Sequence, residues 1–169
     1  MYIENINNSD VKGKLEASFE ELNNIVQIID SLGQASRPSP YLSKYAIIRA
    51  SGTIESCFKI IISDFLLLHT ENESLSNFIN NTIRYTSQNP SYSNIISVLK
   101  GIDKSLGISF KEKVNNLENK EQILDSLKSL VENRNSLAHG GSPSTSALQV
   151  KNYFQHAIIV LLVLEEVCS

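Results

Sequence analysis

The chain has 169 residues, of which 41% are hydrophobic and 20% are charged, and it carries a formal net charge of −3. These values are those of an ordinary globular protein. They exclude a disordered chain and a protein that coats nucleic acid through a general positive field. The length suits one domain, and we expect residues 1–169 to form a single helical unit.

The first half of the chain predicts two long helices. Ser9 or Asp10 is expected to cap a helix that ends at Gly33. Prolines interrupt the pattern over residues 34–40, which are expected to form a loop. Residues 41–69 follow as a helix that is apolar around most of its circumference. Such a helix is buried by neighbours on several sides, so we expect it to form the scaffold of the fold.

The second half predicts further helices, at residues 73–88, 94–106, 121–138 and 147–167. Gly107 is expected to end the second of these, and residues 108–118 to form one or two helical turns to which no role is assigned. No alternating pattern of strand length and no repeat of solenoid period is visible. The predicted fold is all-α, an up-down bundle of about five to seven helices with a long buried second helix.

The sequence gives no sign of membrane insertion or secretion. It shows no leading basic and apolar signal segment, and its longest apolar runs, at 157–164 and 65–68, are too short to cross a bilayer. Cys57 and Cys168 are isolated and lack the paired spacing of a disulfide framework. We therefore expect a cytoplasmic protein without membrane contact, in which both thiols are reduced core residues.

The most unusual chemistry lies where the predicted helix over 121–138 ends. Arg134 falls within the apolar stripe of this helix, where a guanidinium needs an anionic partner. Asn135 and His139 are four residues apart and share one ridge, and Gly140-Gly141 supplies the left-handed residue that ends a helix. A structural interpretation is also open, in which Arg134 pairs with a buried carboxylate and His139 caps helical carbonyls.

A second set of polar residues lies on the long helix over 41–69. Arg49, Glu55 and Lys59 fall within an arc of about 120° at 3.6 residues per turn. We expect Glu55 to lie against Arg134 and Arg49 to point at the same cleft. The alternative is that these charges only fix the register of the helix.

Two stretches of the chain, residues 31–54 and 133–164, contain no acidic residue. Their cations are Arg37, Lys44, Arg49, Arg134 and Lys151. If the two stretches meet in space, they form a basic cleft on an acidic body. Scattered charge on a solvated face is the alternative.

Several common kinds of active site are absent from the sequence. There is no Gly-rich phosphate loop, no His-Glu-x-x-His and no Gly-x-Ser-x-Gly. The Ser-x-x-Lys matches at Ser56 and Ser97 lack companion motifs and are interpreted as chance. His69, His139 and His156 have no spacing that would place a metal-binding pair on one helix. We therefore predict no metal and no cofactor.

The segment Arg-Asn-Ser-Leu-Ala-His, from Arg134 to His139, resembles the Arg-x(four to six)-His signature of the HEPN family (higher eukaryotes and prokaryotes nucleotide-binding domain). Its setting is also similar, because the segment lies in a late helix of an all-helical chain and is followed by a loop and one apolar terminal helix. Arg49 and Glu55 resemble a second polar pair found in some bacterial defence-associated members.

The resemblance implies a metal-independent endoribonuclease of toxin or phage-defence type. HEPN domains usually dimerise about the signature helices, so two copies of Arg134 and His139 would line one cleft. In that arrangement Arg134 would bind the scissile phosphate of RNA and His139 would act as general base or acid. Asn135 would orient the imidazole or the phosphate, with Arg49 and Glu55 in supporting roles. The resemblance also implies an antitoxin or a nucleotidyltransferase as a partner.

Two other functions are left open. The chain would be a noncatalytic nucleotide- or protein-binding module if the same cleft only bound its ligand, as HEPN domains without activity do. It would be a plain structural bundle if His139 were buried and bonded only to the backbone.

Overall fold

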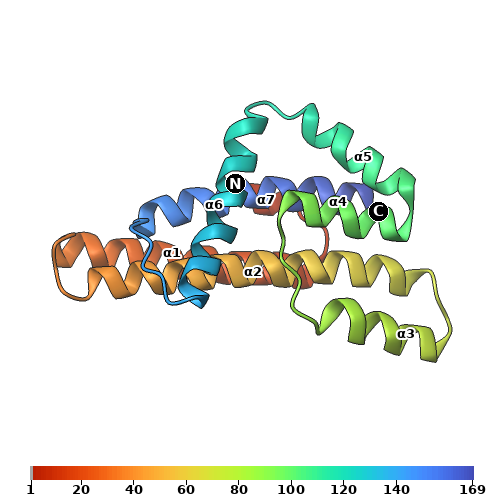
Figure 1. Cartoon of the computed structure of the whole chain (residues 1–169), viewed down its shortest axis with the longest axis horizontal. Helices are drawn as coiled ribbons and strands as arrows, with labels where there is room; N and C mark the ends of the chain where they lie inside the picture. The colour runs from red at the N-terminus through yellow and green to blue at the C-terminus, as the bar shows by residue number, and fades with distance from the viewer. Residues whose placement is uncertain (1) are drawn as a thin grey trace.

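A computed structural model describes residues 2–169, and within that range the chain is entirely helical (Figure 1). Its seven α-helices are preceded by a short 3-10 helix, η1 (Tyr2–Asn5). They are α1 (Ser9–Leu32), α2 (Ser39–Leu68), α3 (Glu73–Ile79), α4 (Tyr92–Ile102), α5 (Lys104–Asn115), α6 (Lys120–Ala138) and α7 (Ala147–Val167), with a π-helical turn, η2 (Asn80–Arg84), directly after α3. The predicted all-α class is confirmed.

Helix α2 lies at the centre of the fold (Figure 1). It packs against α1, α7 and α6, and these three neighbours cover different parts of its circumference. Its buried apolar residues are accordingly spread around the helix: Ala46, Ile47, Ala50, Ile54, Cys57, Phe58, Ile60, Ile61 and Ile62. The prediction of a long, buried second helix is confirmed.

Helix α7 is a strongly apolar element of the fold. Within residues 2–169 it is the helix whose overall length and composition would suit a membrane span, a feature that the short uninterrupted run at 157–164 did not indicate. Half of its most apolar stretch is buried inside the protein, and it packs against α2, α6, α1 and α5. These contacts are the features of a core helix, whose apolar residues are satisfied by its neighbours.

The two cysteines lie in this core. Cys57 on α2 and Cys168 after α7 are free thiols and both are buried. Burial raises the pKa of each thiol to about 12, because a thiolate is poorly solvated there. Both are therefore the small core residues that the sequence predicts.

The ends of α1 and α2 differ slightly from prediction. Asn8, and not Ser9 or Asp10, caps α1 by accepting a hydrogen bond from the Val11 N–H at 3.1 Å. Helix α1 ends at Gly33, as expected, where φ is +87°. Helix α2 begins at Ser39, earlier than predicted, because Pro40 occupies its first turn, where the missing N–H has no helical acceptor to lose.

The prediction that Gly107 ends a helix is wrong. The break falls at Asp103, which adopts an extended conformation between α4 and α5 and caps α5 by accepting from the Ser105 N–H at 2.6 Å. Gly107 lies inside α5, where a Cβ would come within 2.4 Å of Lys100 Cγ and 3.2 Å of the Ile96 carbonyl oxygen. It therefore allows close packing of α4 on α5, and residues 108–118 mostly belong to a regular helix.

The predicted helix over 73–88 is shorter than expected. Helix α3 ends at Ile79, and the π-helical turn η2 carries the chain only to Arg84. The next residues, 85–91, are not helical and cross α2 before α4 begins (Figure 1). This crossing brings the backbone of Gln88 to Glu55 on α2, and so completes one wall of the site described next.

Candidate active site

The C-terminal end of α6 is closed by a Schellman motif. Gly140 has φ +79°, its N–H donates to the Leu137 carbonyl at 3.1 Å, and the Gly141 N–H donates to the Ser136 carbonyl at 2.7 Å. A Cβ at Gly141 would lie 2.2 Å from Ser136 Oγ and 2.9 Å from Ser136 O. Both glycines are therefore required, and they fix the backbone position of His139 as the residue that follows α6.

His139 is exposed at this end of α6. Its backbone N–H donates to the Asn135 carbonyl at 3.1 Å, but no hydrogen bond or ion pair joins its imidazole ring to any of residues 2–169. The ring is thus neither buried nor committed to the backbone, which removes the observation that would have favoured a purely structural role. It is available to a ligand or to another protein chain.

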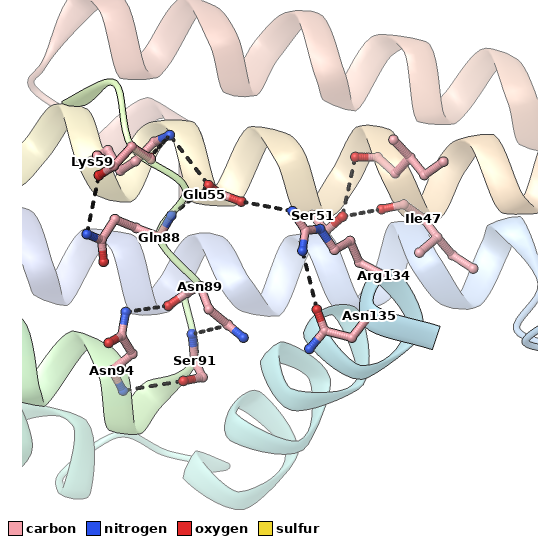
Figure 2. A network of polar contacts seen from close by, with 12 residues as sticks. Ile47, Ser51, Glu55, Lys59, Gln88, Asn89, Ser91, Asn94, Arg134 and Asn135 are labelled. Atoms are coloured by element: carbon pink, nitrogen blue, oxygen red, sulfur yellow. Dashed lines mark hydrogen bonds and ion pairs between the residues drawn. The ribbon is translucent and has the colours of Figure 1, made fainter. Parts of the chain in front are cut away.

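Arg134 lies one and a half turns earlier on α6 and pairs with Glu55 of α2. Its Nη2 is 3.8 Å from Glu55 Oε2, and Figure 2 shows the two side chains meeting between the helices. The Arg134 side chain is 44% exposed, whereas that of Glu55 is 14% exposed. The expected pairing of these residues is present, but Arg134 is not buried. Near the end of α6 the apolar stripe reaches the edge of the core, and Arg134 meets the polar residue Glu55 of α2 there.

The Glu55 carboxylate is held from two further directions (Figure 2). Its Oε1 accepts from the Gln88 N–H at 2.9 Å and lies 3.4 Å from Lys59 Nζ. Lys59 in turn donates to the Thr86 carbonyl at 2.9 Å. Glu55 is therefore fixed by the segment that crosses α2, and it presents its second oxygen to Arg134.

Asn135 completes the group on α6. Its Oδ1 accepts from Arg134 Nη1 at 3.4 Å, so the amide lies beside the guanidinium. Between these side chains and Pro90 is a crevice of about 10 Å³, which holds at most one water molecule. A phosphate would therefore have to bind on the exposed side of Arg134 and not inside this crevice.

Arg49 lies elsewhere, and the expectation that it points at the same cleft is wrong. Its Nε is paired with Glu21 of α1, which also accepts a hydrogen bond from the Tyr45 hydroxyl. That hydrogen bond from Tyr45, with Arg49 as a lesser cause, lowers the pKa of Glu21. Arg49 thus faces the groove between α1 and α2, whereas Glu55 faces the crevice beside Arg134. A role for it in phosphate positioning stays a prediction.

Lys59 and the Gln88 backbone are the members of this network that the sequence interpretation did not assign to the site. The signal for Lys59 was present, because a glutamate and a lysine four residues apart on a helix commonly pair. No local signal marks Gln88, whose contribution is a main-chain N–H brought in by the crossing segment.

A much larger hollow than this crevice lies away from Arg134. It has a volume of about 860 Å³ and lies between the N-terminal half of α6 and α7. His156 lines it, with Nδ1 2.7 Å from Ser126 Oγ. Among residues 2–169, no three His, Cys, Asp or Glu side chains come together as metal ligands would. Residues 2–169 therefore contain no cluster of these side chains that is arranged to bind a metal ion.

The comparisons with known proteins agree with the signature at the end of α6. The family model of the RiboL-PSP-HEPN domain matches residues 14–169, which is most of the chain. No curated protein and no solved structure gives a match. The matched span includes every helix that builds the Arg134 and His139 region, and the chain is therefore a member of the RiboL-PSP-HEPN family of HEPN domains.

Proposed function

We propose that this protein is a metal-independent endoribonuclease of toxin or phage-defence type. The observation that carries the proposal is the position of the HEPN signature, with Arg134 and His139 both solvent-accessible at the end of α6 and Arg134 tethered to Glu55. HEPN domains are often ribonucleases, and this chain retains both residues on which such chemistry depends. A module that only binds has no need of an unpartnered histidine.

The proposed reaction is attack of a ribose 2′-hydroxyl on the adjacent phosphorus. The 2′-oxygen forms a bond to phosphorus, the bond from phosphorus to the 5′-oxygen breaks, and the products are a 2′,3′-cyclic phosphate and a 5′-hydroxyl. One group removes the 2′-hydroxyl proton and another protonates the departing 5′-oxygen. Imidazole suits either task because its ordinary pKa lies near neutral pH.

Arg134 is assigned to the phosphate. Its ion pair with Glu55 occupies one edge of the guanidinium, and its 44% exposure leaves further N–H donors for phosphate oxygens. Glu55 positions the guanidinium and does not touch the substrate in this scheme. Asn135 lies against Arg134 and orients either the guanidinium or the bound phosphate.

The site needs a second copy of the chain. Each protomer supplies one His139, whereas cleavage requires a proton acceptor and a proton donor. A homodimer about the ends of α6 places two Arg134 and two His139 side chains around one phosphate. The free His139 ring and the exposed Arg134 are the groups that such an interface would use. The proposed setting is the cytoplasm, with an antitoxin or a nucleotidyltransferase as partner.

The test is incubation of the purified protein with labelled RNA in EDTA. Wild type is expected to release fragments that end in a 2′,3′-cyclic phosphate. His139→Ala and Arg134→Ala are expected to lower the rate by about a hundredfold or more each. His69→Ala is the matched control, because His69 is also an exposed histidine that follows a helix, at the opposite end of α2 from Ser39.

Two outcomes would contradict the proposal. Cleavage that persists in both variants would assign the activity to another site or to a contaminant. RNA binding without cleavage, lost in Arg134→Ala and Arg134→Glu, would instead identify the chain as a noncatalytic binding module.

A further inference from the structure

A second feature of the molecule lies beside the proposed active site. The loop that follows His139 packs along the start of α2 and encloses a groove of about 340 Å³. Residues 34–44 form one wall, and residues 142–146 form the other. These are parts of the two stretches that contain no acidic residue, so the two stretches do meet, and Lys44 is the one of their five cations that lines this groove.

The groove is polar and carries a single charge. Its lining includes Ser39, Ser43, Ser142, Ser144, Thr145 and Ser146, of which the Ser39 and Ser146 hydroxyl groups are already bonded within the fold, and its charged member is Lys44. Asp30 contacts the lining at one edge, where it accepts a weak 3.4 Å hydrogen bond from Gln34. Away from that edge, a cation among neutral hydroxyl groups attracts an anionic ligand.

An aromatic ring stands next to this cation. Tyr41 is 73% exposed, and Lys44 Nζ lies 6.0 Å from the centre of its ring. No neighbouring element of residues 2–169 covers that ring. An exposed aromatic face beside a cation is the combination that binds single-stranded nucleic acid, because bases stack on the ring and the cation contacts the phosphate.

The groove and the proposed active site lie along one side of α2. Lys44, Ser51 and Glu55 follow a spacing of seven and four residues, which places them on one face of the helix. Lys44 and Glu55 are therefore separated by about 16 Å along the axis at 1.5 Å per residue. Arg134, which pairs with Glu55, and Ser142, which lines the groove with Lys44, are joined by the last turn of α6 and the turn that closes it, so no further helix lies between the site and the groove along the chain.

We infer that this groove binds the single-stranded RNA that flanks the cleaved bond. The inference rests on the proposed function and names the conformation of its substrate. Lys44 contacts a backbone phosphate, Tyr41 stacks on an unpaired base, and the serine hydroxyl groups bond to ribose or phosphate oxygens. An RNA duplex does not fit this role, because its bases are already stacked and cannot reach Tyr41.

The test measures binding separately from cleavage. In a His139→Ala background, the dissociation constant for a single-stranded oligouridylate is expected to rise about tenfold with Tyr41→Ala and about threefold with Lys44→Ala. Tyr41→Phe keeps the ring and is expected to bind like the parent. Lys44→Ala should also reduce the slope of log K against log salt by about 0.7, whereas Tyr41→Ala should leave it unchanged.

Two matched controls are available. Tyr85 is 74% exposed and follows η2, which packs on the C-terminal half of α2 through Arg84 and Asp64, far along the helix from Lys44, so Tyr85→Ala should not affect binding. Lys111 is an exposed lysine on α5, and Lys111→Ala should not change the salt slope. In the active parent, Tyr41→Ala should slow cleavage of the long strand and not of a dinucleotide, which is too short to reach the groove.

Failure of this inference is distinct from failure of the proposed function. Equal RNA binding by Tyr41→Ala, Tyr85→Ala and the parent would overturn the inference that the groove binds RNA, and would leave the proposed nuclease activity unaffected. A wild-type protein that cleaves no RNA would overturn the nuclease itself. If Tyr41→Ala and Lys44→Ala changed the concentration dependence of dimer formation and not RNA binding, the face would be a contact between copies of the chain.

Discussion

A histidine lies beside each half of α6, and the two are in opposite circumstances. Near its start, Ser126 holds His156 of α7 beside a hollow of about 860 Å³. Ser126 Oγ also donates to the Gln122 carbonyl at 2.8 Å, so His156 is bonded to a serine that is itself held on α6. At the end of α6, His139 has no ring partner among residues 2–169, and the crevice beside Arg134 has only about 10 Å³.

The difference shows that the volume of a cavity and the position of the family signature point to different surfaces of this protein. The large hollow has a histidine that is already bonded within the fold, whereas Arg134 of the family signature lies beside a crevice of only about 10 Å³. An imidazole without an internal partner is suited to meet something external, either substrate or a second chain. The predictions below test this contrast, from the largest expected effect to the smallest.

The most decisive test replaces each of the two histidines by alanine in a separate variant. His139→Ala should lower the RNA cleavage rate by about a hundredfold or more, because a proton-transfer group is lost. His156→Ala should leave the rate near that of wild type, since His156 lies at the other end of α6. Initial rates on one labelled RNA compare both variants. A larger loss with His156→Ala would reverse the assignment of the two ends.

The next test concerns the turn that fixes His139. Gly141→Ala places a methyl group against Ser136 Oγ and the Ser136 carbonyl, and should cost about 2 kcal/mol of unfolding free energy. The control is Gly101→Ala on α4, where nothing lies within 4 Å of the added Cβ. That helix substitution should stabilise the protein by about 0.5 kcal/mol. Urea titrations measure both, and equal stabilities would mean that the turn relaxes freely.

A third test isolates the support of Arg134. Glu55→Ala removes the carboxylate that tethers the guanidinium and should lower kcat about tenfold, equivalent to about 1.4 kcal/mol, with a smaller change in KM. Glu55→Gln keeps an acceptor for the Gln88 N–H and should be intermediate. Glu21→Gln on α1, which changes the partner of Arg49 instead, should leave kcat unaltered. A drop in kcat with Glu21→Gln would bring Arg49 back into the site.

The smallest effect belongs to the start of α6. Ser126→Ala removes the hydrogen-bond partner of His156 Nδ1 and should cost about 1 kcal/mol of stability without a change in cleavage. Ser97→Ala at an exposed position of α4 should change stability by less than about 0.5 kcal/mol. Thermal unfolding and a cleavage assay on the same samples separate the two effects. Slower cleavage by Ser126→Ala would connect the hollow to the active site.

Much of the fold was predictable because its helices are strongly periodic. The bounds of α7 agree with the prediction, and the apolar circumference of α2 correctly indicated its burial. The errors arose where one residue type can serve two different structural roles. A glycine can end a helix or allow two helices to touch, and Gly107 does the second, while Asp103 provides the break. The sequence does not state which neighbour a glycine faces.

One contact of the site was predictable from the sequence, and others were not. The pairing of Glu55 with Arg134 followed from two charges that each needed a partner on an apolar helix. Arg49 needed one as well, but helical geometry could not reveal that Glu21 on α1 would supply it. The same limit hid Gln88, whose contribution depends on the path of the segment after η2.

The two acid-free stretches have a consequence for how the protein meets its ligands. They gather five of the fifteen lysines and arginines, namely Arg37, Lys44, Arg49, Arg134 and Lys151, while all eighteen carboxylates of Asp and Glu lie elsewhere in the chain. Of these five cations, Arg49 and Arg134 pair with Glu21 and Glu55, whereas Lys44 lines the groove beside Tyr41 and has no ion pair among residues 2–169. A phosphate group that approaches this groove therefore meets a cation whose charge no paired carboxylate offsets, and added salt screens that attraction beyond about 10 Å at 0.1 M.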